Sequence, residues 1–445
     1  MNAPATLVRK ASRQTAKGPQ DPAGPGQGDL AALRFFALRT VTNARRYAEA
    51  LRVFKPDEFG TGPATPSPAH VAAVNLLLKE ARARQRVEER KLVAVASRVT
   101  GPDDALRNAL LSLKERNHML AGESEKLWEF YLNLFSQRRG PMASMLRGID
   151  RIALDCYQAV YLGLGRARSI PSPAPFAYVE TGFGPATFRR GVKLSKLGAR
   201  ANPFPLVKIP YHRLVNPWSL GAIPHEVAHN LQSDLGLWDI MPRQIGQAFD
   251  KAGLPKRNAA VWMRWHKETY ADLAGTLLIG PAYVGALMDV VGRSREQTAA
   301  YSDEAVHPTP IIRVPLNLYL LEKMGFKKDA DSFRAAWDAL YPAKSWEAIP
   351  AWVRARLPHQ IATVVEAICM TPMPHYGGRR LFDVIRFELK HAQLTQEAAE
   401  RLETGLSTGV LPERFLIGAA RLALARGKVP AETISRNFYA TLERS

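Results

Sequence analysis

The amino-acid sequence predicts a predominantly helical α+β protein, and three observations support this fold class. Apolar side chains recur at the helical period over most of the 445 residues. The strand-like stretches are short and confined to one part of the chain, near residues 176–211. Hydrophobic residues make up 46% and charged residues 23% of the sequence, which is ordinary for a globular protein. Wholesale disorder, collagen-like repeats and a disulfide scaffold are therefore excluded.

The chain begins with an expected tail and continues with helices. Residues 1–28 are rich in Pro, Gly, Ala and basic side chains, and we expect a disordered basic tail. Residues 29–169 are expected to be an N-terminal helical region. Its helical patterns lie at 30–52, 69–99, 103–137 and 141–163.

Short strands are expected after residue 170, where prolines break the helical pattern. The candidates are residues 176–181, 187–192 and 206–211. Pro210 has no backbone N–H to donate to a sheet, so the third strand is expected at a sheet edge.

Helical patterns resume near residue 217 and dominate to the C-terminus. We expect a core domain at 170–328 and a helical C-terminal domain at 329–445. The predicted helices of this last domain lie near 331–341, 345–369, 379–391, 394–407, 411–426 and 430–443.

The net charge of +20 is unevenly distributed. Residues 1–100 carry +9 and residues 151–200 carry +6, whereas residues 201–250 carry −1. A strongly basic chain suggests an anionic partner such as nucleic acid, recruited through the basic N-terminal half. No RNA-binding aromatic signature or paired zinc finger accompanies the basic runs. The charge is therefore expected to serve solubility or recruitment.

The cellular compartment is predicted to be the cytoplasm. Cys156 and Cys369 are too few for a disulfide framework and fit a reducing compartment. The N-terminus lacks the apolar segment of a secretory signal. Because no apolar run reaches about 18 residues, no membrane-spanning helix is expected.

The motif HExxH occurs at His225, Glu226 and His229. On a helix, residues four apart share a face, so both imidazoles can point at one metal ion while Glu226 reaches a nearby water. The sequence allows two starting points for this helix. A helix from Asn216-Pro217 would be kinked by Pro224, whereas a start near Ala222 would put His225 in the opening turn.

A third metal ligand is expected from the helical pattern around Glu268 and Asp272. These two carboxylates are four residues apart and precede a strongly apolar stretch, which indicates a buried helix. Glu268 is the expected third protein ligand of Zn²⁺. Asp272 is expected to accept a hydrogen bond from His225 or His229 and to fix the orientation of that ring.

A third element lies at residues 303–313, where His307-Pro308 precedes a predicted helix and Arg313 follows His307 by six residues. His307 and Arg313 are predicted to donate hydrogen bonds to the oxyanion of a tetrahedral intermediate.

Taken together, these motifs resemble the gluzincin metallopeptidases, which combine HExxH, a downstream E-x-x-A-D helix, and His-Pro with Arg six residues beyond the His. The resemblance is greatest to the soluble minigluzincins and to the catalytic core of the CAAX endopeptidases and heat-shock-type membrane metallopeptidases, over about residues 176–325. The matching positions are His225, Glu226 and His229; Glu268, Ala271 and Asp272; and His307, Pro308 and Arg313.

The resemblance implies a zincin-like core with a small mixed sheet, a helix that carries HExxH, and a second helix that carries the Glu. It also implies an edge strand that binds peptide by strand addition. Residues Leu206, Val207, Lys208 and Ile209 occupy the place of that strand. The tryptophans near the motifs, including Trp238, are expected in the core.

The predicted function is that of an intracellular zinc metallopeptidase acting on a peptide or protein substrate. Two alternatives remain open. The first is a zinc hydrolase of a non-peptide amide. The second is a binding or regulatory protein that keeps a zincin scaffold while its basic regions contact nucleic acid or another partner.

Overall fold

The computed structural model describes residues 27–101, 103–165, 170–182, 184–197 and 200–444. The predicted tail at 1–28 lies almost wholly outside these residues. The described chain forms two compact units. The N-terminal unit consists of the described residues up to Leu51 together with Glu80–Gly122, and the main unit consists of Arg52–Lys79 and the described residues from Glu123 onward. The expected boundaries at residues 170 and 329 both fall inside the main unit.

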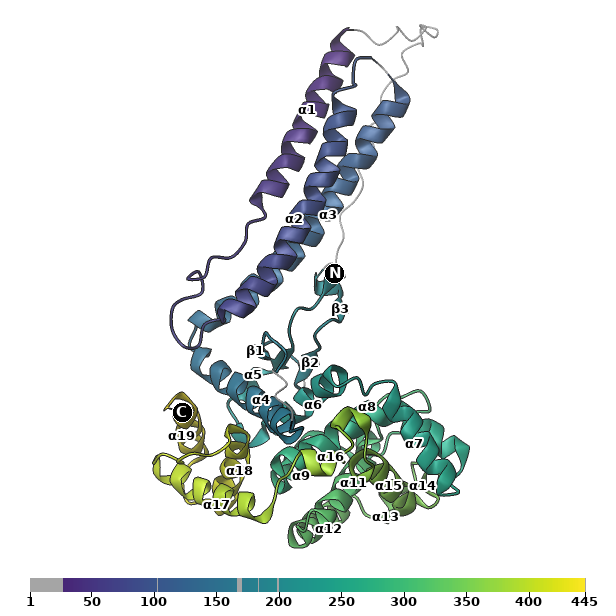
Figure 1. Ribbon diagram of the computed structural model, residues 1–445, viewed down its shortest axis with the longest axis vertical. Coiled ribbons are helices and arrows are strands. Elements are labelled where there is room, and N and C mark those ends of the chain that lie inside the picture. Colours follow the sequence, from purple (N-terminus) through teal and green to yellow (C-terminus); the bar gives the residue numbers. More distant parts are fainter. Residues whose placement is uncertain (1–26, 102, 166–169, 183, 198–199, 445) are drawn as a thin grey trace, which may run out of the picture. The chain divides into compact units, whose positions relative to one another are not determined.

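Four helices make up the first part of the chain, close to their predicted positions. They are α1 (Gln27–Ala50), α2 (Pro68–Ala96), α3 (Asp104–Ser136) and α4 (Ala143–Gly163). In the N-terminal unit, α1 lies alongside parts of α2 and α3 (Figure 1). One buried apolar cluster of this unit consists of Ala37, Ala44, Leu92, Val99 and Leu110.

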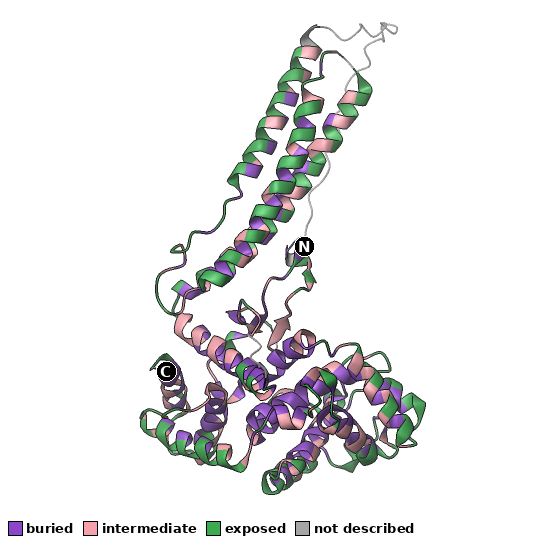
Figure 2. Cartoon of the chain, in the orientation of Figure 1, coloured by how far each residue is buried: buried purple, intermediate pink, exposed green. Residues whose placement is uncertain are grey.

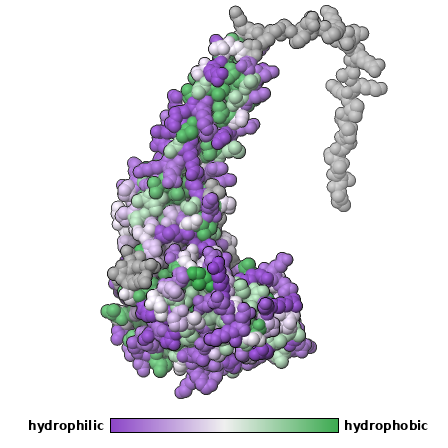
Figure 3. All heavy atoms as spheres, turned by 45° about the vertical axis from the view of Figure 1, so that its right-hand side comes forward, coloured by the Kyte–Doolittle hydropathy of each residue, from purple (hydrophilic) through white to green (hydrophobic). Residues whose placement is uncertain are grey.

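The surface of the N-terminal unit carries several large apolar side chains. Phe35, Leu38 and Met119 are each at least 64% exposed. Figure 3 shows apolar side chains mixed with hydrophilic ones over these helices.

The sheet of the main unit has three strands in the order β1 (Phe176–Val179), β5 (Leu206–Ile209) and β2 (Ala186–Phe188). Strand β1 pairs with β5 in parallel and β2 pairs with β5 in antiparallel orientation. A separate pair consists of β3 (Lys193–Leu194) and β4 (Arg200–Ala201). The prediction of a helical α+β protein with a small mixed sheet is confirmed.

The predicted edge position of Leu206, Val207, Lys208 and Ile209 is wrong. These residues form β5, the central strand, with Leu206, Val207 and Ile209 fully buried. The error came from Pro210, which lies one residue beyond the end of the strand, so its missing N–H interrupts no pairing. The antiparallel edge of the sheet is β2.

Helices build the rest of the main unit. Those that precede residue 325 are α5 (Tyr211–Leu214), α6 (Ala222–Asp234), α7 (Ile240–Lys251), α8 (Lys256–Ile279), α9 (Pro281–Val291), α10 (Arg295–Thr298) and α11 (Pro310–Lys323). Those that follow are α12 (Lys327–Leu340), α13 (Ala343–Trp346), α14 (Ala351–Arg354), α15 (Leu357–Val365), α16 (Leu381–Val384), α17 (Leu389–Thr404), α18 (Leu416–Arg426) and α19 (Ala431–Arg444).

The C-terminal helices differ from prediction in two places. The helix expected at 345–369 is divided into α13, α14 and α15, because Pro350 cannot continue a helix and Arg356 adopts a left-handed conformation with φ of 56°. The helix expected at 379–391 is only the short α16, and α17 begins at Leu389.

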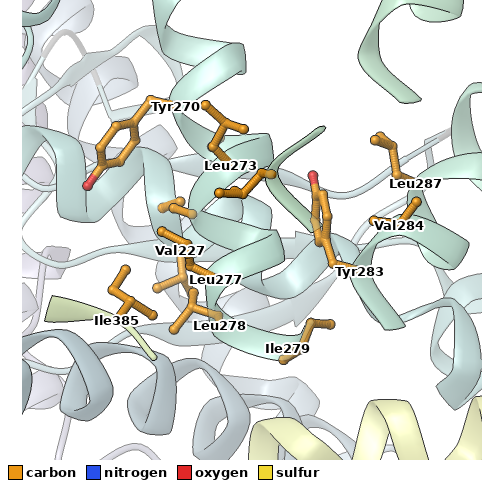
Figure 4. Packing of buried hydrophobic residues seen from close by; sticks show 14 of the residues in the cluster. Val227, Tyr270, Leu273, Leu277, Leu278, Ile279, Tyr283, Val284, Leu287 and Ile385 are labelled. Carbon is orange, nitrogen blue, oxygen red and sulfur yellow. The ribbon is translucent and has the colours of Figure 1, made fainter. Parts of the chain in front are cut away.

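One hydrophobic core extends through the main unit, from Leu146 on α4 to Leu442 on α19. Buried residues are concentrated in this unit (Figure 2). In its centre, Val227 of α6 packs near Leu273 and Leu277 of α8 and Tyr283 of α9 (Figure 4). Within the described part of the chain, no helix combines the length and apolar character needed to cross a membrane.

Candidate metal centre

The HExxH motif lies in the first half of α6, which begins at Ala222 after a separate 3-10 helix at Pro217–Ser219. Of the two starts that the sequence allowed, the structure has the later one. Pro224 is the third residue of α6, where a backbone N–H has no partner within the helix, so proline removes no hydrogen bond. His225 and His229 follow on one face, with ring centroids 4.8 Å apart and planes nearly perpendicular.

Glu268 on α8 faces both imidazoles. Its carboxylate oxygens lie 3.3 Å from His225 Nε2 and 3.4 Å from His229 Nε2. One ligand atom from each of the three residues lies within 4.8 Å of the other two. The structure thus brings together the three metal ligands predicted from sequence.

Glu226 lies beside this cluster and is 8% exposed. No described side chain donates a hydrogen bond to its carboxylate. Burial raises the pKa of Glu226, although the charges of His225 and His229 oppose the shift. A buried carboxylate with raised basicity and a free oxygen is suited to take a proton from water.

Asp272 is completely buried one helical turn beyond Glu268. Its Oδ1 atom lies 3.0 Å from His225 Nδ1, as predicted. The ionised carboxylate only accepts, so His225 donates to Asp272 through Nδ1–H, which leaves Nε2, on the side of Glu268, as the ring nitrogen that could bind a metal. Burial alone would raise the pKa of Asp272, but the Arg313 guanidinium and hydrogen bonds lower it to about 2.

Arg313 contacts the Asp272 carboxylate. Its Nε donates to Asp272 Oδ2 at 2.7 Å and its terminal nitrogen to Oδ1 at 2.6 Å, and its side chain is only 12% exposed. The guanidinium thus makes a bidentate contact with the Asp272 carboxylate. The terminal nitrogen also lies 3.8 Å from Glu268 Oε2, so Arg313 is at the cluster. The expected role of Arg313 as an oxyanion donor stays a prediction, and its contact with Asp272 adds a second possible role in positioning that carboxylate.

Tyr283 on α9 completes the surroundings of Asp272 and was missed in the sequence. Its hydroxyl donates to Asp272 Oδ1 at 2.6 Å and lies 3.0 Å from His225 Nδ1. The ring fits against α8 because residue 275 is glycine, where a Cβ would come within 2.4 Å of Tyr283.

The break between α8 and α9 puts Tyr283 in reach of the site. Gly280 has φ of 59°, which favours glycine, and Pro281 opens α9. The pair Gly280-Pro281 is a visible sequence signal for a reversal after α8. Nothing in this pair of residues indicates that Tyr283, three residues after Gly280, contacts Asp272.

His307 reaches the cluster from the loop before α11. Its Nε2 lies 3.3 Å from Glu268 Oε1, and its side chain is 63% exposed. The structure thus brings His307 to the solvent side of the Glu268 carboxylate. Burial would raise the pKa of Glu268, but its contacts with His225, His229 and His307 hold that pKa well below the ordinary value.

Strand β2 runs beside the helix that carries the cluster. Asn230, which follows His229, donates from Nδ2 to Thr187 Oγ1 of β2 at 2.7 Å. The antiparallel edge strand of the sheet is thus fixed to α6 next to the second histidine.

Comparison with known proteins adds no relative. No family model matches the chain, and no curated protein or solved structure gives a significant match. The resemblance to gluzincins rests on the sequence motifs alone.

Proposed function

We propose that this chain is a zinc-dependent metallopeptidase. The observation that carries the proposal is the convergence of His225, His229 and Glu268 from two packed helices, with the buried Glu226 carboxylate beside them. Structural ion pairs on a helix surface do not need two imidazoles and two carboxylates at one buried point.

The donor set fits zinc. Two imidazole nitrogens and one carboxylate oxygen are the ligands of many catalytic zinc sites. Atoms that each lie about 2.0–2.2 Å from one zinc in a tetrahedral arrangement are about 3.3–3.5 Å apart. Glu268 Oε2 lies 3.3 Å from His225 Nε2, and the other oxygen, Oε1, lies 3.4 Å from His229 Nε2. One atom from each residue lies within 4.8 Å of the other two, so the three side chains are close enough to converge on one ion.

Each residue has a distinct task in this proposal. Zinc held by these ligands would acidify water and polarise a peptide carbonyl. Glu226 accepts the proton of the attacking water on its carboxylate and later passes it to the leaving amine. His307, exposed beside Glu268, donates a hydrogen bond to the developing oxyanion. Asp272, with Arg313 and Tyr283, holds His225 in the tautomer that binds metal.

The peptide is proposed to bind along β2. Within the described sheet β2 pairs only with β5, so its other edge can accept an extended peptide. Thr187 of β2 is joined to Asn230 at the HExxH helix, which brings this edge next to the proposed ligands. Backbone pairing at β2 replaces the pairing expected at β5.

The variant Glu226→Gln tests the proposal. Zinc content of the purified chain is measured by mass spectrometry, and cleavage is measured on an unstructured protein and a peptide library. Zinc is expected at one equivalent in both forms, and turnover is expected to fall about 10²–10⁴-fold in the variant. Glu347→Gln, an exposed carboxylate without an ion-pair partner among the described residues, is the matched control.

Other outcomes would contradict the proposal in different ways. Cleavage by Glu226→Gln at the wild-type rate would remove Glu226 from the mechanism. Zinc-dependent hydrolysis of N-acyl amino acids without peptide cleavage would favour a non-peptide amidase. Binding of DNA with steep salt dependence, without any hydrolysis, would favour a regulatory protein built on this scaffold.

A further inference from the structure

Two cations contact the ring of Trp238, in the loop between α6 and α7. The guanidinium carbon of Arg189 lies 3.4 Å and the Lys267 Nζ 3.6 Å from the centroid of its ring. Trp238 was expected in the core, but it is only partly buried. Its ring instead holds two like charges close together.

Both cations belong to elements of the candidate metal centre. Arg189 directly follows β2, and it donates to Ser233 Oγ at 3.1 Å. Ser233 lies one helical turn beyond His229 on α6, and Lys267 directly precedes Glu268 on α8. The cations therefore connect the edge strand to the neighbourhood of two proposed ligands.

Each cation has an acidic residue in its neighbourhood, Asp234 for Arg189 and Asp239 for Lys267, but neither carboxylate pairs with it directly. Among the described residues, Arg189 and Lys267 form no ion pair within 4.0 Å. The nearby Asp234 accepts instead from the hydroxyl of Tyr157 at 3.2 Å. Two unpaired positive charges repel each other and attract an anion.

A second stack of this type in the main unit shows the usual arrangement. Arg257 lies 3.7 Å from the ring centroid of Trp352, and its terminal nitrogen also approaches Asp303 at 3.8 Å. That stack has a carboxylate within ion-pair distance, whereas among the described residues the cations at Trp238 have acidic neighbours only farther away.

We propose that Arg189, Trp238 and Lys267 form a subsite that binds a carboxylate of the peptide substrate. This inference rests on the proposed peptidase function. The guanidinium and the ammonium would donate to the carboxylate oxygens, while Trp238 keeps both cations in place. The carboxylate belongs either to an acidic side chain near the cleaved bond or to the C-terminus of the peptide.

Peptide binding to zinc-loaded Glu226→Gln tests the subsite without turnover. Fluorescent ten-residue peptides carry one Glu at each position in turn, with Gln at the same position as the reference and an amidated C-terminus. A further pair contains no acidic side chain and differs only in a free or amidated C-terminus. Dissociation constants come from fluorescence anisotropy. We expect one carboxylate-bearing peptide to bind about tenfold more tightly than its neutral reference.

Variants in the same background assign this preference to residues. Arg189→Gln and Lys267→Met are each expected to remove most of it, while Met preserves the apolar stem of the lysine. Lys251→Met, at the exposed end of α7, removes a charge elsewhere and should leave the preference intact. Circular dichroism confirms that each variant is folded.

The outcomes distinguish a failure of the proposed subsite from a failure of the proposed peptidase function. Tighter binding of a peptide with an internal Glu would mean that the subsite binds an acidic side chain. Tighter binding of the peptide with a free C-terminus would mean that it binds the C-terminal carboxylate. Equal binding of all peptides, or a preference that survives both variants, would overturn the subsite even if the wild type cleaves peptides. Carboxylate-dependent binding that both variants abolish would support the subsite even if no peptide were cleaved.

Discussion

The N-terminal unit and the α8 region of the main unit are both helical, but they place their charges differently. In the N-terminal unit Arg45 pairs with Glu89 at 3.0 Å while the arginine side chain is 57% exposed. On α8, Asp272 is completely buried and holds the largely buried Arg313 at 2.6 Å. Exposed pairs contribute little to stability, whereas buried charges are costly to desolvate and must be matched on every side.

This difference indicates where the chemistry lies. The N-terminal unit buries one carboxylate, Glu88, whose partners Lys91 and Arg116 are themselves exposed. The α8 region maintains carboxylates, imidazoles and a guanidinium within one buried network, which a purely structural helix would not need. The proposed function rests on this buried charge, while the large net charge of the chain is concentrated elsewhere.

The largest effect is expected from Asp272→Asn. Asparagine keeps the shape of Asp272 but removes the negative charge from Arg313 and His225, so zinc affinity should fall about 10–100-fold. The free energy of unfolding should fall by about 3–5 kcal/mol, because the buried Arg313 loses its hydrogen-bonded counterion and keeps only Glu268 at 3.8 Å. Chelator competition measures the affinity, and denaturant titration measures the stability.

Asp150→Asn separates these two effects. Asp150 accepts two hydrogen bonds from the buried Arg138 at 2.7 and 3.0 Å, away from the metal ligands. Its replacement should also destabilise the main unit but leave zinc affinity unchanged. Equal loss of zinc affinity in both variants would mean that Asp272 acts through stability alone.

The ligand set could be predicted from sequence because its spacing is local. His225 and His229 are one turn apart on α6, and Glu268 and Asp272 are one turn apart on α8, so helical geometry orients each pair before any tertiary contact. The general fold class followed from the same periodicity. The sequence did not show how α6 packs against α8.

Features that depend on long-range pairing could not be predicted in this way. The central position of β5 follows from pairing on both sides, about which the position of Pro210 carries no information. The contact of Arg313 with Asp272 and the approach of Tyr283 depend on how α11 and α9 pack on α8. The sequence therefore predicted which residues cluster, but it did not predict the contacts of the residues around them.

An intermediate effect is expected from Tyr283→Phe. This change keeps the ring that packs against Gly275 and removes the hydroxyl that contacts Asp272 and His225. Zinc affinity should fall about 3–10-fold, with little loss of turnover at saturating zinc. In NMR spectra of the metal-free chain labelled with ¹⁵N-histidine, the His225 Nδ1 signal should shift.

Tyr157→Phe is the matched control for Tyr283→Phe. Tyr157 is also buried, and its hydroxyl donates to Asp234 at 3.2 Å. Its loss should affect stability by a similar amount while the His225 signal stays in place. An unchanged His225 signal in Tyr283→Phe would show that the tyrosine only fills space.

The smallest effect is expected from Arg45→Ala in the N-terminal unit, and it tests the other side of the comparison. Because Arg45 is largely in solvent, loss of its pair with Glu89 should cost no more than about 1 kcal/mol. Hydrogen exchange should report slightly faster opening of α1 and α2 around that pair, and zinc affinity should stay within about twofold. A change in zinc affinity as large as that of Asp272→Asn would show that the N-terminal unit is energetically coupled to the metal centre. In that case the exposed Arg45–Glu89 pair would matter to the metal centre as much as the buried Asp272–Arg313 pair, and the two regions would not differ in the way described.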